Sequence, residues 1–187
     1  MKIAIFGGSF DPIHIGHIHA VVEAKIKMDF DKIIFIPAKQ SPLKTLKPIE
    51  DEHRINMLEI ITREYDFIAL DKYEIDHERA SYTYDTARYL KAEFPNDALY
   101  FLMGRDQYLN FDKWYKKDEL LELMHFVVLD RIGDASHIQE PFIQLNQPVV
   151  EVSSTVIRHR IMNNEPVRHQ LDAGVFKYIK EHGLYES

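Results

Sequence analysis

The sequence predicts an α/β fold built on a mostly parallel sheet of five to six strands, with helices on both faces. Short runs rich in β-branched and aromatic residues alternate along the chain with segments of helical periodicity. Such alternation is typical of parallel strands joined by helical crossovers. The segments that follow the strands are unusual in composition. A length of 187 residues suits a single domain over 1–187.

The strand segments are the clearest elements by composition. Residues 2–6 and 32–36 read Lys-Ile-Ala-Ile-Phe and Lys-Ile-Ile-Phe-Ile, which are the nearly continuous apolar runs expected of strands buried on both faces. Similar runs predict strands over 67–70, 98–103 and 126–129, with a weaker sixth strand over 149–152.

Six segments show helical spacing of apolar residues. In 16–28 the apolar residues Ile18, Val21 and Ile26 lie near one helical face. The other helices are predicted over 52–63, 84–94, 119–124, 155–162 and 172–181. Right-handed crossovers through such helices give a Rossmann-like, doubly wound fold. A strand order of 3-2-1-4-5 then places the first and fourth strands on either side of the switch point.

Composition narrows the function classes. The net charge of −7 argues against a nucleic-acid partner, because no positive field would attract a polyanion. The chain has no cysteine, which excludes disulfides, thiolate zinc sites and thiol nucleophiles. No run approaches the roughly 20 apolar residues that span a membrane, and residues 1–6 are too short for a signal peptide. We therefore expect a soluble, cytoplasmic protein, and homo-oligomer formation is left open.

The unusual residues gather after the predicted strands. Segments 7–17, 37–44, 104–106 and 153–155 each follow a strand, whereas 130–148 shows no clear periodicity. Because the carboxyl ends of parallel strands meet at one edge of the sheet, these four segments are expected to converge there, where ligands bind in such folds.

The first of these segments has features of a phosphate-binding loop. Gly7 and Gly8 allow close backbone approach and positive φ, and the helix expected from Gly16 presents free N–H groups and a positive dipole end. His14 and His17 are three residues apart, so both can donate to phosphate oxygens, and either can become cationic near neutral pH. Taken singly, the two glycines also suit an ordinary turn and the histidines an ordinary surface.

The segment at 153–158 has two interpretations. Ser153, Ser154 and Thr155 are good N-cap residues, and capping alone would explain them. Hydroxyls at a helix start also bind phosphate, and Arg158, about one turn later, can grip phosphate oxygens with two donors.

These motifs resemble the H-x-G-H nucleotidylyltransferase superfamily and, within it, the nicotinate-nucleotide adenylyltransferase family. The resemblance covers essentially the whole chain. It rests on Gly-Gly-Ser-Phe-Asp-Pro at 7–12, His-Ile-Gly-His at 14–17, Arg54-x-x-Met57, Ser-Tyr-Thr at 81–83 with Thr86, Gly104-x-Asp106, Trp114-Tyr115 and Ser-Ser-Thr-x-Ile-Arg at 153–158. One departure is Pro42-Leu43-Lys44, where the family has histidine before the cation, so the phosphate-binding or loop-ordering role of that histidine is in question.

The resemblance implies transfer of the adenylyl group of ATP to nicotinate mononucleotide, with Mg²⁺ carried by ATP. It implies that His14, His17, Lys44 and Arg158 are catalytic, with His17 on the α-phosphate and His14 on the β- and γ-phosphates. The implied ATP-binding residues are Gly7, Gly8, Ser9, Phe10, His14, Gly16, His17, Ser153, Ser154, Thr155 and Arg158. The implied acceptor-binding residues are Lys39, Thr83, Gly104, Asp106, Trp114 and Tyr115, although core packing is an alternative for the lone tryptophan.

Two other functions stay open at this point. One is adenylyl transfer to a different small phosphate ester, such as nicotinamide mononucleotide or phosphopantetheine. The other is a nucleotide sensor without catalysis, which would bind ATP and release no pyrophosphate. The set of His14, His17, Lys44 and Arg158 speaks against the sensor, because binding alone needs no groups placed for a transition state.

Overall fold

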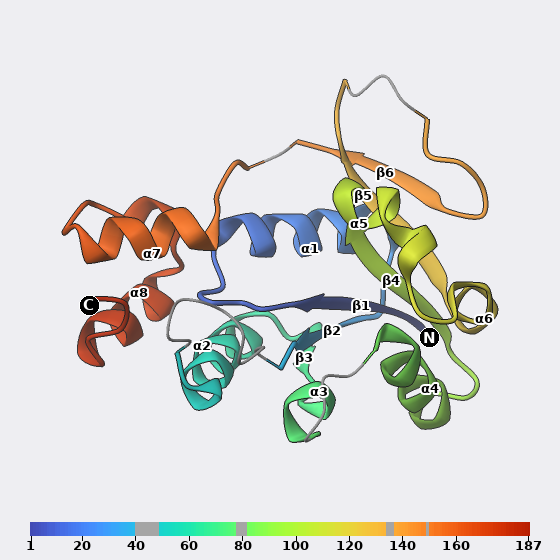
Figure 1. The fold of residues 1–187 in the computed structure, drawn as a ribbon, viewed down its shortest axis with the longest axis horizontal. Helices are drawn as coiled ribbons and strands as arrows, with labels where there is room; N and C mark the ends of the chain where they lie inside the picture. The colour runs from blue at the N-terminus through green and yellow to red at the C-terminus, as the bar shows by residue number, and fades with distance from the viewer. Residues whose placement is uncertain (40–48, 78–81, 134–136, 149) are drawn as a thin grey trace.

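The computed structural model describes residues 1–39, 49–77, 82–133, 137–148 and 150–187. Six parallel strands form one sheet in the order β3-β2-β1-β4-β5-β6, which confirms the predicted fold and the order of its first five strands (Figure 1). The strands are β1 (Lys2–Gly8), β2 (Lys32–Pro37), β3 (Ile68–Leu70), β4 (Ala98–Gly104), β5 (His125–Arg131) and β6 (Ile143–Gln147).

All six predicted helices are present, with ends within two residues of those expected. They are α1 (Ile15–Met28), α2 (Asp51–Glu64), α4 (Thr83–Glu93), α6 (Lys117–Leu123), α7 (Ser154–Met162) and α8 (Ala173–Glu181). Four further segments are too short to show a helical period in sequence: α3 (Tyr73–Asp76), α5 (Arg105–Leu109), η1 (Phe111–Lys113) and η2 (Arg168–Gln170). In the part of the chain that the structure describes, no helix combines the length and apolar character needed to cross a membrane.

The predicted position of the sixth strand is wrong. β6 lies at Ile143–Gln147, inside the segment that shows no clear periodicity, and residues 150–152 belong to no strand. β6 is the edge strand and pairs only with β5. Its apolar residues alternate with Gln144 and Asn146, so it lacks the continuous apolar run of the inner strands.

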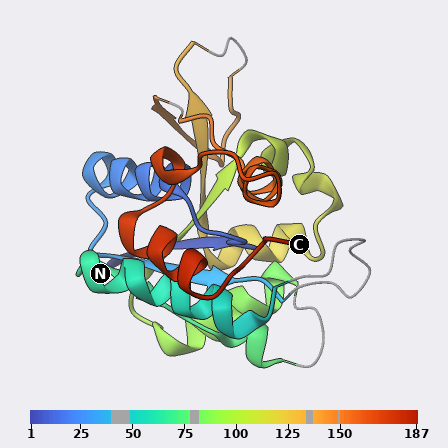
Figure 2. The same ribbon diagram turned by 90° about the vertical axis from the view of Figure 1, so that its left-hand side faces the viewer.

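The two faces of the sheet are covered by different helices. One face packs against α1, α2, α7 and α8 through strand residues such as Ala4 and Phe35. The opposite face packs against α4, η1 and α6 through alternate residues such as Ile5 and Ile36. Figure 2 shows α8 running beside α2, where the Tyr178 hydroxyl lies 2.7 Å from His53 Nδ1.

The switch point lies between β1 and β4, which are neighbours in the sheet although their crossovers pass to opposite faces. β1 continues into α1 on the first face, and β4 continues into α5 and η1 toward the second. The segments after these two strands therefore diverge toward opposite faces at the carboxyl edge of the sheet, which is where ligands bind in doubly wound folds.

Candidate active site

The segment after β1 begins in the strand itself. Gly7 and Gly8 pair with β2, and a Cβ on Gly8 would lie 3.3 Å from the ring of Phe10. The glycine therefore lets this ring pack against the strand end, where it is buried. The positive φ expected at a glycine lies at Phe10 instead, with φ of 48°. Gly8 thus serves close packing and not a left-handed turn, whereas a Cβ on Gly7 would meet its nearest neighbour, the Ile36 carbonyl oxygen, at an ordinary 3.8 Å.

His14 and His17 form a stacked pair at the start of α1. His14 is the N-cap residue, and its Nδ1 accepts from the Gly16 N–H at 3.1 Å. His17 Nδ1 accepts from the His14 N–H at 3.2 Å, and the ring centroids are 3.7 Å apart. Because each Nδ1 is an acceptor, the neutral rings carry their proton on Nε2. The pair therefore offers two Nε2–H donors beside the helix N-terminus.

Both histidines are neutral at physiological pH. Burial lowers the pKa of His14 to about 4. Burial and the neighbouring His14 lower the pKa of His17 to about 3. The prediction that either ring becomes cationic near neutral pH is therefore wrong, because the enclosed rings lose hydration and face each other. As neutral donors they can still hydrogen-bond phosphate oxygens.

Gly16 makes room for the imidazole of His14. A Cβ on Gly16 would lie 2.9 Å from Cε1 and 3.0 Å from Nδ1 of that ring, and 3.3 Å from the Val150 carbonyl oxygen. A side chain here would push the His14 ring out of place. The space above Gly16 is therefore taken by the imidazole of His14, whose ring lies over the helix start.

The start of α7 meets the segment after β1. Ser154 Oγ donates to the Pro12 carbonyl oxygen at 2.8 Å. Ser153 occupies the N-cap position but makes no side-chain capping hydrogen bond, and Thr155 is exposed. The hydroxyl of Ser154 therefore fastens two segments together, so capping alone does not explain this motif.

Arg158 is brought to the same place. Its Nη1 donates to the Asp11 carbonyl oxygen at 2.7 Å, and its Nη2 donates to Thr155 Oγ1 at 3.3 Å. The structure therefore joins the two predicted phosphate-binding motifs, which are about 140 residues apart in sequence. A guanidinium half-buried beside helix-start N–H groups is well suited to bind a phosphate.

Two residues of this region, Arg54 and Tyr185, are given no role by the sequence argument. Arg54 is fully buried on α2, donates to the Ser9 carbonyl oxygen at 2.6 Å and pairs with Asp51 at 2.6 Å. Tyr185, in the segment after α8, donates to Asp11 Oδ1 at 2.6 Å. Arg54 lies at the spacing of the buried α2 face formed by Met57, Leu58 and Ile61, and this spacing could have marked it as a buried arginine. The contact between Tyr185 and Asp11 has no local signal in the sequence.

The two lysines predicted to act after β2 differ in what the structure describes. Lys44 and Leu43 lie outside the described residues, as does Ser81. Lys39 Nζ donates to the His77 carbonyl oxygen, which directs it toward the end of α3. The roles predicted for Lys39 and Lys44 therefore stay predictions.

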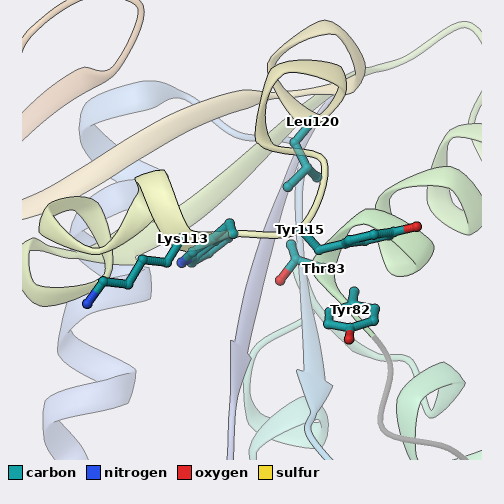
Figure 3. A pocket seen from close by; sticks show the side chains of 6 residues that line it. Tyr82, Thr83, Lys113, Tyr115 and Leu120 are labelled. Atoms are coloured by element: carbon teal, nitrogen blue, oxygen red, sulfur yellow. The ribbon is translucent and has the colours of Figure 1, made fainter.

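A cavity of about 520 Å³ lies at the N-terminal end of α4 (Figure 3). It is lined by three of the predicted acceptor-binding residues, Thr83, Trp114 and Tyr115, together with Tyr82, Lys113 and Leu120. Trp114 packs edge-on against Phe101, with ring centroids 5.8 Å apart, so the lone tryptophan both completes the core and lines the cavity. The two interpretations of this residue are therefore compatible.

Aromatic rings flank this cavity. Tyr82 and Tyr115 face one another with ring centroids 4.6 Å apart, and both are largely exposed (Figure 3). Lys116 Nζ lies 4.6 Å from the ring centre of Tyr84 and 5.5 Å from that of Tyr115. The cavity therefore offers flat apolar surfaces with a cation close by, which suits a planar, negatively charged ligand.

Gly104 and Asp106 are on the switch-point segment but do not line this cavity. Gly104 ends β4 and is the N-cap residue of α5, and a Cβ on it would meet nothing within 4 Å. Asp106 is exposed in the first turn of α5. Gly104 and Asp106 are both exposed, and their contacts with a substrate stay predictions.

Comparison with known proteins identifies the family of this site. The family model described as cytidylyltransferase-like matches residues 5–160. The nicotinate-nucleotide adenylyltransferase of Bacillus subtilis is 39% identical over 187 residues, covering 100% of this chain and 99% of that protein. A protein named probable nicotinate-nucleotide adenylyltransferase from Staphylococcus epidermidis is 36% identical, covering 98% of this chain and 97% of the relative.

Solved structures agree with the fold. A Plasmodium falciparum nicotinic acid mononucleotide adenylyltransferase complexed with NaAD has a TM-score of 0.79 at 24% identity, covering 99% of this chain and 97% of that one. A putative nicotinate-nucleotide adenylyltransferase from Vibrio parahaemolyticus has a TM-score of 0.73 at 21% identity, covering 100% and 96%. From the family match and the full-length relatives, the chain belongs to the cytidylyltransferase-like family and, within it, to the nicotinate-nucleotide adenylyltransferases.

Proposed function

We propose that this protein transfers the adenylyl group of ATP to nicotinate mononucleotide, giving nicotinate adenine dinucleotide and pyrophosphate. The observation that carries the proposal is the neutral, stacked pair of His14 and His17 at the start of α1, joined to Arg158 of α7 through the segment between them. Membership of the nicotinate-nucleotide adenylyltransferases supports the choice of nucleotide and acceptor.

The phosphate side of the site consists of the segment after β1, the start of α1 and Arg158 of α7. We propose that it positions the triphosphate and stabilises its charge. The Nε2–H groups of His14 and His17, the N-terminus of α1 and the guanidinium of Arg158 are donors suited to phosphate oxygens. Negative charge grows on the oxygens around the α-phosphorus and on the leaving pyrophosphate as the transfer proceeds. Donors fixed before the substrate arrives stabilise this charge without reorganising, which is the main source of catalysis in such transfers.

The acceptor needs no general base. A phosphate monoester has a second pKa of about 6, so the phosphate of the acceptor is mostly dianionic at neutral pH. One of its oxygens attacks the α-phosphorus of ATP, the new P–O bond forms, and the bond between the α-phosphorus and the bridging oxygen of pyrophosphate breaks. Neutral histidines suit this chemistry, because hydrogen-bond donation is required of them and proton removal is not.

The acceptor side provides the recognition. A pyridine ring can stack on the aromatic surfaces of Trp114 and Tyr115, while the first turn of α4 at Thr83 presents backbone N–H groups to a carboxylate. Lys116, whose Nζ lies 5.5 Å from the ring centre of Tyr115, adds positive charge near this ring. We propose that this combination favours the acid over the amide.

Mg²⁺ is proposed to enter with ATP as part of the substrate. The donors of the phosphate side are imidazole, guanidinium and backbone N–H groups, which fit phosphate oxygens and not a cation. Mg²⁺ is commonly held by substrate phosphates, which matches this donor set. We also propose that the enzyme works in the cytoplasm, while its oligomeric state is left to measurement.

The test is a product analysis by mass spectrometry. The purified protein is incubated with ATP and Mg²⁺ and with one of three acceptors: nicotinate mononucleotide, nicotinamide mononucleotide or phosphopantetheine. We expect nicotinate adenine dinucleotide and one equivalent of pyrophosphate, with a higher kcat/KM for the acid than for the amide. A dominant product from phosphopantetheine would overturn the acceptor, and ATP binding without pyrophosphate release from any acceptor would favour the sensor.

A further inference from the structure

Thr86 belongs to the motif at 81–86 and has no part in the proposed function. It lies at the end of the first turn of α4, where its side chain is buried. Its Oγ1 donates to Glu74 Oε1 of α3 at 2.8 Å. A helical threonine hydroxyl often bonds a carbonyl oxygen of the preceding turn of its own helix. The Thr86 hydroxyl instead bonds a carboxylate of another helix, so it connects α3 to the first turn of α4.

The Glu74 carboxylate lies partly enclosed between α3 and α4. Burial raises the pKa of this carboxyl, while the hydrogen bond from Thr86 opposes the rise. A carboxylate that leaves water needs hydrogen-bond donors, and a hydroxyl that bonds an ionised oxygen makes a stronger bond than one between neutral groups. The bond between Thr86 and Glu74 is therefore a strong constraint on how the two helices lie.

A second hydroxyl–carboxylate bond lies one turn further along α4. Tyr89 donates to Asp71 Oδ2 at 3.0 Å, and its ring stacks on that of Tyr73 with centroids 4.2 Å apart. Thr86 and Tyr89 are three residues apart, as are Asp71 and Glu74, so each pair shares one side of its segment. A helix of four residues such as α3 is not stable by itself. The segment from Asp71 to Glu74 is thus built against α4.

The first turn of α4 is also a wall of the acceptor cavity. Tyr82 and Thr83 line the cavity (Figure 3), and Thr86 follows Thr83 by three residues on the same helix. The buried residues Ala87 and Leu90 pack α4 on the sheet. Apolar contacts have little directionality, whereas a hydrogen bond fixes both distance and direction. The bond to Glu74 therefore determines where this turn stands along the cavity.

We propose that Glu74 is a positioning residue for the acceptor: its carboxylate holds Thr86 and thereby fixes the first turn of α4 at the cavity. The inference rests on the proposed function, in which the backbone N–H groups at Thr83 meet the acceptor carboxylate. A displacement of about 1 Å in such a group is enough to weaken binding and catalysis strongly. The proposed phosphate side stands on α1 and α7, so ATP binding is independent of this bond.

The first test compares Thr86→Val with Thr62→Val by steady-state kinetics. Thr62 is the matched control, because its hydroxyl donates to the Glu59 carbonyl oxygen within α2. We expect Thr86→Val to raise the KM for nicotinate mononucleotide about fivefold, the scale of one hydrogen bond, with the KM for ATP unchanged. Thr62→Val should leave both KM values unchanged. An unchanged acceptor KM in Thr86→Val, or an equal rise in both KM values, would overturn the proposal.

Variants of Glu74 separate positioning from a general loss of stability. Glu74→Leu removes the acceptor oxygen and should raise the acceptor KM as Thr86→Val does. Glu74→Gln keeps an oxygen for the Thr86 hydroxyl and should bring this KM back to within about twofold of the wild type. The double variant Glu74→Leu, Thr86→Val should be no worse than either single variant, because no enclosed polar group is left without its partner. Multiplied losses in the double variant, or no rescue by Gln, would contradict the proposal.

Hydrogen exchange followed by mass spectrometry tests the same bond without any substrate. Thr86→Val should speed amide exchange in peptides from α4 about threefold and leave exchange in α2 unchanged, because α4 loses a contact that holds its first turn. If the wild-type protein makes no product with any acceptor, the proposed function fails, and the exchange data still decide the role of Glu74. Unchanged exchange in α4 overturns that role, and faster exchange confined to α4 supports it.

Discussion

The segment after β1 is held by hydrogen bonds from α2, α7 and the segment after α8, whereas the acceptor cavity is lined mainly by aromatic and aliphatic side chains. On the phosphate side, His14 is buried, and backbone N–H groups donate to the Nδ1 atoms of both imidazoles and so fix the pair. At the proposed acceptor cavity, by contrast, Tyr82 and Tyr115 are exposed. If the proposed roles of the two sides hold, this difference leads us to expect that the phosphate side is set before substrate arrives and governs the chemistry, while the acceptor side governs selectivity.

Removing a fixed donor should have the largest effect. We expect His17→Ala to lower kcat by a factor of about a hundred or more, the scale of one lost oxyanion-type donor. His19→Ala is the matched control, since this neighbouring α1 histidine contacts the Pro148 carbonyl oxygen instead of the imidazole pair. Near-normal turnover in a folded His17→Ala protein would contradict the division between the two sides.

The depressed pKa values make the phosphate side sensitive to acid. Above pH 6.5, the ordinary pKa of histidine, His14 is mostly neutral in both the folded and the unfolded chain. As the pH falls toward about 4, the unfolded chain binds a proton that the folded chain does not, so the free energy of unfolding decreases. Over this window we expect His14→Ala to lose less stability than the wild type, by about 3 kcal/mol.

Urea unfolding at pH 7, 6, 5 and 4 measures this difference. Parallel losses in the wild type and His14→Ala would show that the imidazole pair is better hydrated than its burial indicates.

A single methyl group at the helix start tests how rigid the phosphate side is. Gly16→Ala places a Cβ 2.9 Å from the His14 ring, so we expect kcat/KM for ATP to fall about tenfold as the ring moves. Gly174→Ala is the control, because its Cβ would meet Ile60 at 2.7 Å in the core between α8 and α2. We expect this control to lower the unfolding temperature with KM unchanged. Comparable kinetics in the two variants would show that the His14 ring adapts freely.

The fold was predictable where burial on two faces leaves a continuous apolar run. β1 and β2 have such runs, and their positions follow from composition. β6 has Gln144 and Asn146 among its five residues, because an edge strand exposes one side, and it was placed wrongly. The α3 and α5 helices have four and five residues, which is too short for a helical period.

The geometry of the site could be predicted where the residues that contact one another are also close in the sequence. His14, Gly16 and His17 act through contacts within three residues, so the motif contains its own geometry. The contact of Tyr185 with Asp11 spans 174 positions and depends on how α8 packs on the sheet. The protonation state of the histidines was also missed, because it depends on burial that spacing does not reveal.

The smallest expected effect concerns the acceptor side. Tyr115→Ala removes an exposed ring that faces Tyr82 at the cavity, so we expect the KM for nicotinate mononucleotide to rise about three- to fivefold. The KM for ATP is the internal control and should not change, since no contact of Tyr115 reaches the segment after β1 within the described residues. Initial rates with one substrate varied at a time give both constants. If both KM values rise together, the two sides are coupled through the residues between them, and the acceptor cavity then contributes to nucleotide binding as well as to selectivity.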